Sequence, residues 1–293
     1  MESPDIGDTV TLIDFLRVHY WSEHALTLKP QSMAQLRYAV ESFGRHLGRP
    51  AVLTDLDKLS VIGWMAARKD CVSAATVNKE RRSILCLWRC AAELQLTAWP
   101  PRLPKVKQPL NVPHTFTQDE MHRLLKACSS MPEHTFWRSL LLALFDTGGR
   151  VSAVLAVRVA DCDLQRQTIL LRAESSKTLT AQLLSIAEDT TAAIAAHVLG
   201  GDSAGRVWNW PHHHRRLFVW FRKLCELASV PLPRGKCFHS IRRTTASAVA
   251  HQFGLDTASQ LLGHSSVQVT KLYVRADQAA LSRLRIADHL PRP

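Results

Sequence analysis

The strongest constraint on the fold is a proline-rich break about a third of the way along the chain. Three prolines fall within the five residues from Pro100 to Pro104. Each proline fixes its own φ, lacks a backbone N–H and pushes the preceding residue towards extended backbone, so a helix does not continue through this stretch. We therefore interpret residues 100–114 as an interdomain linker. It separates a domain over residues 8–99 from a second domain over residues 115–290, which suits a chain of 293 residues.

The segment before the break is predicted to be a bundle of helices. Apolar residues recur there at helical spacing. The predicted helices cover residues 11–20, 32–47, 59–67 and 75–94.

The last of these helices has two different faces. At about 100° per residue, one arc is apolar and one is basic. The apolar arc contains Val77, Ile84, Trp88 and Ala91. The basic arc contains Lys79, Arg82 and Arg89. The apolar face is expected in the core, and the basic face is either a surface that contacts the DNA backbone or an ordinary solvated helix face.

The net charge favours the DNA-contact interpretation. The chain carries 37 Lys plus Arg against 25 Asp plus Glu, which gives a formal charge of +12. Residues 29–107 alone contain 14 Lys plus Arg and 6 Asp plus Glu, a local balance of +8. An excess of this size indicates a polyanionic partner, and nucleic acid is the first candidate.

The second segment is predicted to be mainly helical with a small antiparallel sheet. Thr117 and Glu120 have the spacing of a capping box, and residues 139–145 form a strongly apolar run. Short strands are expected over residues 168–172 and 182–186. Further helices are expected over residues 190–198, 215–228, 241–252 and 257–262.

Several other classes of protein are excluded by the sequence. No apolar run approaches the roughly 18 residues that a membrane helix needs, and the acidic N-terminus does not resemble a signal peptide. The seven cysteines are odd in number and contain no C-x-x-C pair. This argues against a disulfide framework and a structural zinc site, and it predicts a cytoplasmic protein without a metal. The run His212-His213-His214 is read as the start of a basic helix, because nothing nearby completes a metal-ligand set.

Three short motifs carry candidate chemistry. Arg150 follows two glycines that end an apolar helix, and His239 and Arg242 lie three residues apart at an expected helix start. His264 follows a Leu-Gly pair and is itself followed nine residues later by Tyr273. Taken alone, none of the motifs is specific. Arg150 could be a surface residue after a helix cap, the His239–Arg242 spacing is common by chance, and Tyr273 could be a half-buried aromatic residue.

Together, and in this order, the motifs resemble the tyrosine recombinase (phage integrase) family. The resemblance covers nearly the whole chain and implies a helical, SAM-like core-binding domain followed by an α+β catalytic domain. Lys177 lies between the two expected strands, where the family places a catalytic lysine. One position departs from the pattern: many members carry an acidic residue three positions after the first arginine, and here that residue is Ala153.

The resemblance implies a specific phosphoryl-transfer reaction. Tyr273 would attack the scissile phosphate to form a 3′-phosphotyrosine, while Arg150 and Arg242 stabilise the charge on the phosphate oxygens. His239 would accept or relay the tyrosine proton, and His264 would donate a hydrogen bond. Lys177 would protonate the leaving 5′-oxygen. Such a reaction needs no ATP, metal or other cofactor.

The implied partners are double-stranded DNA and further copies of the chain, assembled as a tetramer on two DNA sites. After Tyr273, residues 279–284 are expected to form a short helix that packs on its own domain or on a neighbouring subunit. Two alternatives remain at this point: a type IB topoisomerase-like enzyme, which shares the chemistry, and a catalytically impaired DNA-binding regulator, which Ala153 favours.

Overall fold

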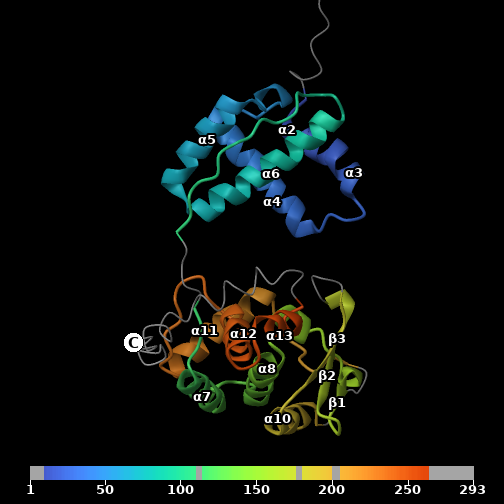
Figure 1. The fold of residues 1–293 in the computed structure, drawn as a ribbon, viewed down its shortest axis with the longest axis vertical. Coiled ribbons are helices and arrows are strands. Elements are labelled where there is room, and N and C mark those ends of the chain that lie inside the picture. The colour runs from blue at the N-terminus through green and yellow to red at the C-terminus, as the bar shows by residue number, and fades with distance from the viewer. Residues whose placement is uncertain (1–9, 110–113, 176–179, 200–204, 264–293) are drawn as a thin grey trace, which may run out of the picture. The chain divides into compact units, whose positions relative to one another are not determined.

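The computed structural model describes residues 10–109, 114–175, 180–199 and 205–263. In this part the chain is mainly helical with one small antiparallel sheet, which confirms the predicted fold class (Figure 1). The chain divides into two compact units, Met1–Leu110 and Asn111–Pro293. None of the helices in the described ranges is both long enough and apolar enough to cross a membrane.

The first unit is a bundle of helices. Its elements are α2 (Leu12–Phe15), η1 (Leu16–Tyr20), α3 (Trp21–His24), α4 (Pro30–Leu47), η2 (Leu53–Asp55), α5 (Lys58–Cys71) and α6 (Ala74–Glu93). Local sequence determines where the long helices begin and end. Pro30 occupies the first position of α4 and the left-handed Gly48 ends it, while the side chains of Asp57 and Ser73 cap α5 and α6.

The two faces predicted for α6 are confirmed. Its four predicted core residues are all buried in the core that α6 shares with α4 and α5. Lys79, Arg82 and Arg89 are all exposed. The basic arc is therefore available to a partner.

The first part of the expected linker belongs to the first unit. The side chain of Leu103 is buried in its core, and Arg81 Nη2 donates to the Leu103 carbonyl oxygen at 2.6 Å. Asn78 forms two hydrogen bonds with the backbone of Val106, at 2.8 Å and 3.0 Å. The prolines thus end the helical region as expected, but side chains of α6 fix the extended backbone that follows as far as Val106.

The second unit contains the sheet and most of the helices. Its helical elements are α7 (Gln118–Ala127), η3 (Cys128–Ser130), α8 (His134–Thr147), α9 (Val151–Val154), η4 (Val159–Asp161), η5 (Ala173–Ser175), α10 (Glu188–Val198), α11 (His214–Leu227), α12 (His239–Phe253) and α13 (Leu255–Leu261). The antiparallel strands are β1 (Cys162–Asp163), β2 (Thr168–Leu171) and β3 (Gln182–Ser185), in the order β1-β2-β3. In the register, Cys162 pairs with Ile169 and Leu170 with Leu183.

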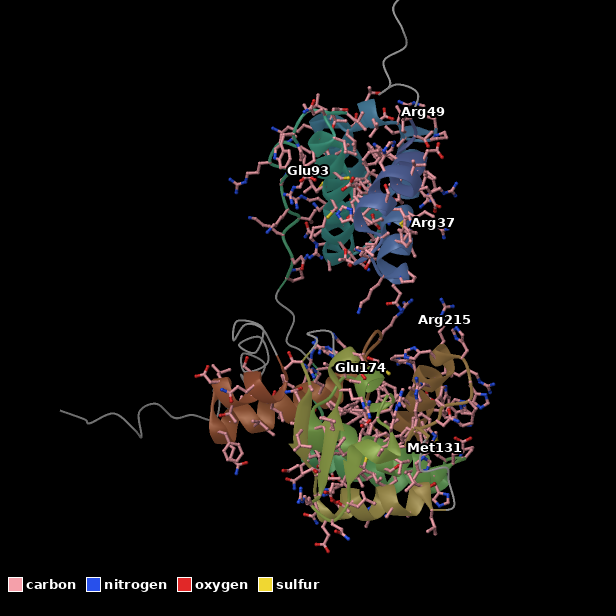
Figure 2. All side chains as sticks on the ribbon, turned by 90° about the vertical axis from the view of Figure 1, so that its right-hand side faces the viewer. Arg37, Arg49, Glu93, Met131, Glu174 and Arg215 are labelled. Carbon is pink, nitrogen blue, oxygen red and sulfur yellow. The ribbon has the colours of Figure 1, made fainter. Side chains whose placement is uncertain are left out.

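Helix α8 forms the buried centre of this unit. It packs against α10 and α12, and α12 packs in turn against α13 (Figure 1). Figure 2 shows the side chains that fill the interior of the unit. Trp137 on α8 is fully buried, and the indole N–H of the buried Trp208 donates to Ser139 Oγ on the same helix at 3.0 Å. Because α8 packs against several other elements, the position of its C-terminal end at Thr147 is fixed, and so is the start of the segment that follows.

Candidate active site

The side chain of Arg242 connects the three sequence motifs. It lies on the first turns of α12 and only 4% of the residue is exposed. Its Nη1 donates to the carbonyl oxygen of Gly148 at 2.8 Å, and its Nη2 donates to that of Leu262 at 2.6 Å. Gly148 precedes Gly149-Arg150, and Leu262 precedes Gly263-His264. A single guanidinium therefore ties together backbone that leads into the other two motifs.

The two glycines before Arg150 are required by the packing at the end of α8. Gly148 has φ +57° and ends the helix in the left-handed conformation that favours glycine. A Cβ on Gly148 would lie 3.2 Å from Leu262 Cδ2, and one on Gly149 would lie 2.8 Å from Val154 Cγ2. The close turn leaves Arg150 at the N-cap position of α9.

Arg150 is half-buried and its guanidinium is available to an anion. No carboxylate, carbonyl or hydroxyl of the described residues pairs with it. An arginine that is held on a tight turn and has no carboxylate partner among the described residues keeps its charge for a ligand. This is the property that a phosphate-binding residue needs.

His239 is the first residue of α12 and is exposed. The neighbouring residues Phe238 and Ile241 are buried in the core, which fixes the start of the helix. His239 and Arg242 are three residues apart on α12, and His239 is exposed while Arg242 is buried.

Gln182 is a site residue that the sequence analysis missed. It begins β3, and its side-chain Nε2 donates to the carbonyl oxygens of Gln260 at 2.9 Å and Leu261 at 3.1 Å. A Cβ on Gly263 would lie 3.3 Å from Gln182 Oε1. Gln182 thus holds the end of α13, and with it the backbone that leads to His264, against the sheet. A single polar residue in a short strand gives no signal of this role.

Two threonines that stand beside the motifs in the sequence stabilise the same region through contacts that the sequence does not predict. Thr245 Oγ1 donates to the carbonyl oxygen of Phe145 at 2.7 Å, which joins α12 to the last turn of α8. Thr147 Oγ1 accepts a hydrogen bond from the backbone N–H of Gly149 at 3.1 Å. Both contacts fix the backbone on either side of the turn that precedes Arg150.

A buried ion pair fixes the end of β2, from which the segment with Lys177 departs. The Asp161 side chain is only 2% exposed and accepts from Arg172 Nε at 2.8 Å and from the backbone N–H of Arg158 at 2.9 Å. Burial raises the pKa of the Asp161 carboxyl, but these hydrogen bonds outweigh it, and the pKa lies below its ordinary value. Asp161 therefore remains charged and paired.

Three of the predicted catalytic residues, Lys177, His264 and Tyr273, lie outside the described residues. Among the predicted catalytic residues that are described, Arg242 reaches the turn that precedes Arg150, and His239 lies three residues before Arg242 on α12. Lys79, Arg82 and Arg89 belong to the first unit.

Comparisons with known proteins show the family and the fold. The model of the phage integrase family matches residues 114–280. Tyrosine recombinase XerC of Brucella melitensis is 25% identical over 80% of this chain and 80% of its own length. A lambda integrase tetramer bound to a Holliday junction superposes with a TM-score of 0.73 at 18% identity, covering 90% of this chain and 77% of that one. The Tn1549 transposon integrase in complex with a circular intermediate DNA gives a TM-score of 0.72 at 14% identity, covering 94% and 100%. The family match spans more than half of the sequence, and the chain therefore belongs to the phage integrase family of tyrosine recombinases.

Proposed function

We propose that this protein is a site-specific DNA recombinase that cleaves and rejoins double-stranded DNA through a 3′-phosphotyrosine intermediate. The observation that carries the proposal is the pair of hydrogen bonds from Arg242 to the carbonyls of Gly148 and Leu262. These bonds gather the segments that lead to Arg150 and His264 around one buried cation. Such a convergence is what an enzyme needs in order to hold a phosphate group between several donors.

The two arginines supply the electrostatic part of the reaction. The transition state of phosphoryl transfer places extra negative charge on the non-bridging oxygens, and guanidinium groups stabilise it when they are fixed in advance. Arg242 is fixed by its two carbonyl partners, and Arg150 is fixed by the backbone turn at Gly148 and Gly149. The Arg242 guanidinium is thus preorganised, and the turn fixes the position from which the Arg150 side chain extends.

The remaining groups move protons and form the covalent bond. The phenolic oxygen of Tyr273 attacks phosphorus, its proton passes to His239, and the bond from phosphorus to the 5′-oxygen breaks. Lys177 protonates the departing 5′-oxygen, and His264 donates a hydrogen bond to a non-bridging oxygen. The phosphotyrosine keeps the energy of the original bond, so rejoining by a 5′-hydroxyl needs neither ATP nor a cofactor.

DNA is the proposed partner of both domains. The exposed arc of Lys79, Arg82 and Arg89 is suited to contact phosphates from the domain over residues 8–99, while residues 115–290 carry out the chemistry. The chain would act in the cytoplasm as a tetramer on two DNA sites. The similarity to a lambda integrase that was solved as a tetramer on a Holliday junction supports this assembly.

A covalent-capture assay on a suicide DNA substrate tests the proposal. The Tyr273→Phe variant should form no protein–DNA adduct and should bind DNA as well as the wild type, because only the nucleophilic oxygen is lost. Tyr38→Phe is the matched control, since Tyr38 is an exposed tyrosine of the first unit, and it should form the adduct normally. A protease-sensitive adduct formed by Tyr273→Phe would refute the role of Tyr273.

Two further outcomes separate the alternatives. Strand exchange between two differently labelled sites identifies a recombinase, whereas relaxation of supercoils without exchange identifies a type IB topoisomerase-like enzyme. A wild-type protein that binds DNA but forms no adduct would be a DNA-binding regulator.

A further inference from the structure

Two arginines of the second unit face each other across an isolated antiparallel bridge. Arg158 and Arg206 are the bridge partners. The flanking hydrogen bonds run from Val159 N to Gly205 O and from Val207 N to Val157 O, both at 3.0 Å. This pattern makes Arg158 and Arg206 a non-hydrogen-bonded pair, the geometry in which opposite Cα atoms are about 4.5 Å apart and the side chains are closest.

The backbone bridge therefore holds the Cα atoms of two arginines side by side, while Asp161, which attracts Arg158, is hydrogen-bonded to Arg172. Like charges directly opposite each other on paired strands destabilise a fold. Across the described ranges, neither Arg158 nor Arg206 makes an ion pair with a carboxylate. The backbone bridge fixes where both side chains begin, so the two guanidinium groups can reach the same anion.

The same two arginines line a pocket that a third cation completes. The pocket has a volume of about 210 Å³, and Arg172 contributes to its wall together with Arg158 and Arg206. Ala153 and Ala156 also line it, and their small side chains leave the space open.

The acidic residues of the pocket do not neutralise the pair. Both oxygens of the buried Asp161 carboxylate are already used, one by the guanidinium of Arg172 and the other by the backbone N–H of Arg158. Glu174 (labelled in Figure 2) is largely exposed, and its Oε1 lies 3.9 Å from Arg172 Nη1. Both carboxylates thus pair with Arg172, and Asp161 also attracts Arg158, so the three arginines of the pocket still outnumber its two carboxylates.

We propose that this pocket binds a phosphate-type oxyanion between the guanidinium groups of Arg158 and Arg206. Guanidinium groups recognise phosphate through paired, charge-assisted hydrogen bonds, and two of them can share one tetrahedral anion. The anion is either a free phosphate group or a phosphate of the DNA backbone, since both offer the same oxygens.

The location of the pocket links its occupancy to the candidate active site. Ala153 lies three residues after Arg150, on α9, and Arg172 directly follows β2, before the segment with Lys177. A bound anion would therefore join the elements that carry two proposed catalytic residues. It would stabilise the fold there even in the absence of DNA.

Thermal unfolding of the full chain in inorganic phosphate, against sodium chloride at equal ionic strength, tests the site itself. Phosphate at about ten times its Kd should raise the melting temperature of the second unit by roughly 3 °C. Arg158→Gln and Arg206→Gln should each remove this rise. Arg166→Gln is the matched control, because Arg166 is exposed in the same unit and lies outside this pocket, and it should keep the rise. Ala153→Glu, which places a carboxylate at the pocket wall, should make the protein insensitive to phosphate.

DNA binding distinguishes the two sources of the anion. If a DNA phosphate occupies the pocket, Arg206→Gln should lower the salt dependence of DNA affinity by about one phosphate contact, and bound DNA should abolish the response to inorganic phosphate. If free phosphate occupies it, the salt dependence should be unchanged and the response should persist in the DNA complex. The inference is overturned if phosphate stabilises the wild type no more than chloride and Arg206→Gln leaves the salt dependence unchanged. The phosphate arm does not use Tyr273, so its result is independent of the proposed reaction.

Discussion

Substitution of Gly149 by alanine tests whether the packed turn before Arg150 fixes the catalytic geometry. The φ of Gly149 is not in the left-handed region, so the effect of a methyl group there is steric. Its Cβ would lie 2.8 Å from Val154 Cγ2, 3.1 Å from Thr147 Oγ1 and 3.3 Å from Leu171 Cδ1. Val154 and Leu171 are both buried, so these neighbours have little room to move.

The expected loss of stability in Gly149→Ala follows from overpacking. An added methyl in a closely packed site costs about 1–3 kcal/mol in the free energy of unfolding. Val154→Ala removes the methyl that approaches most closely, and by itself costs about 1.6 kcal/mol for two buried methyl groups plus a cavity term. In the double variant the added methyl fills part of that cavity. The total loss should therefore be smaller than the sum of the single losses, by about 1–2 kcal/mol.

Urea unfolding of the two single variants and the double variant measures these losses of stability. Covalent capture on DNA measures how the substitutions affect the candidate active site. Gly149→Ala should lower the rate of adduct formation by about 100-fold, because a displacement of Arg150 by an ångström misplaces a phosphate donor. Val154→Ala should restore part of that rate. Gly235→Ala is the control: its φ is +78° and no atom lies within 4 Å of a built Cβ, so it should show strain without coupling to Val154. Additive stabilities and an unchanged rate would refute the reasoning.

Three further predictions concern the reaction and the DNA surface. Arg150→Ala and Arg242→Ala should each slow cleavage by at least about 100-fold, measured in single-turnover assays on folded protein, and a wild-type rate would remove that arginine from the site. Lys177→Ala should cleave normal DNA very slowly and should be largely rescued when sulfur replaces the bridging 5′-oxygen, because the sulfur leaves without a proton. Equal defects in cleavage of both substrates would exclude Lys177 as the acid. Replacement of the basic arc (Lys79, Arg82 and Arg89) by Glu should reduce the dependence of DNA affinity on salt. The same replacement of the exposed Arg17, Lys58 and Lys69 is the control and should not. An equal effect of both sets would mean that the basic arc is not a specific contact surface.

Periodicity predicted the long helices well because their burial is one-sided. Val77, Ile84 and Trp88 are buried on α6, while Lys79 and Arg82 are exposed, so the sequence alternates with the helical period. The helices predicted in the second half of the chain begin and end within two residues of α10, α11, α12 and α13. β1 was missed because it has only two residues, too few to show an alternating pattern.

Contacts between distant segments were harder to predict from the sequence. The prolines indicated where helical structure ends, but nothing in the sequence showed that Arg81 and Asn78 would hold the backbone at Leu103 and Val106. These side chains bind backbone groups, and every residue offers a backbone carbonyl. A pattern of residue types therefore does not identify the partner, and the same reason hid the role of Gln182.

The position of Arg242 shows why three individually weak motifs form one site. Burial of a guanidinium is costly unless its N–H groups are satisfied, and the carbonyls of Gly148 and Leu262 each accept a hydrogen bond from one of its two terminal nitrogens. Both of these carbonyl partners are neutral, so they orient the guanidinium without adding a negative charge of their own. The carbonyl of Gly148 is accessible because the helix ends there in a left-handed turn that favours glycine. The glycines, the arginine and the Leu-Gly pair thus depend on one another through the backbone, and the charge they hold in place is the one that the proposed reaction uses.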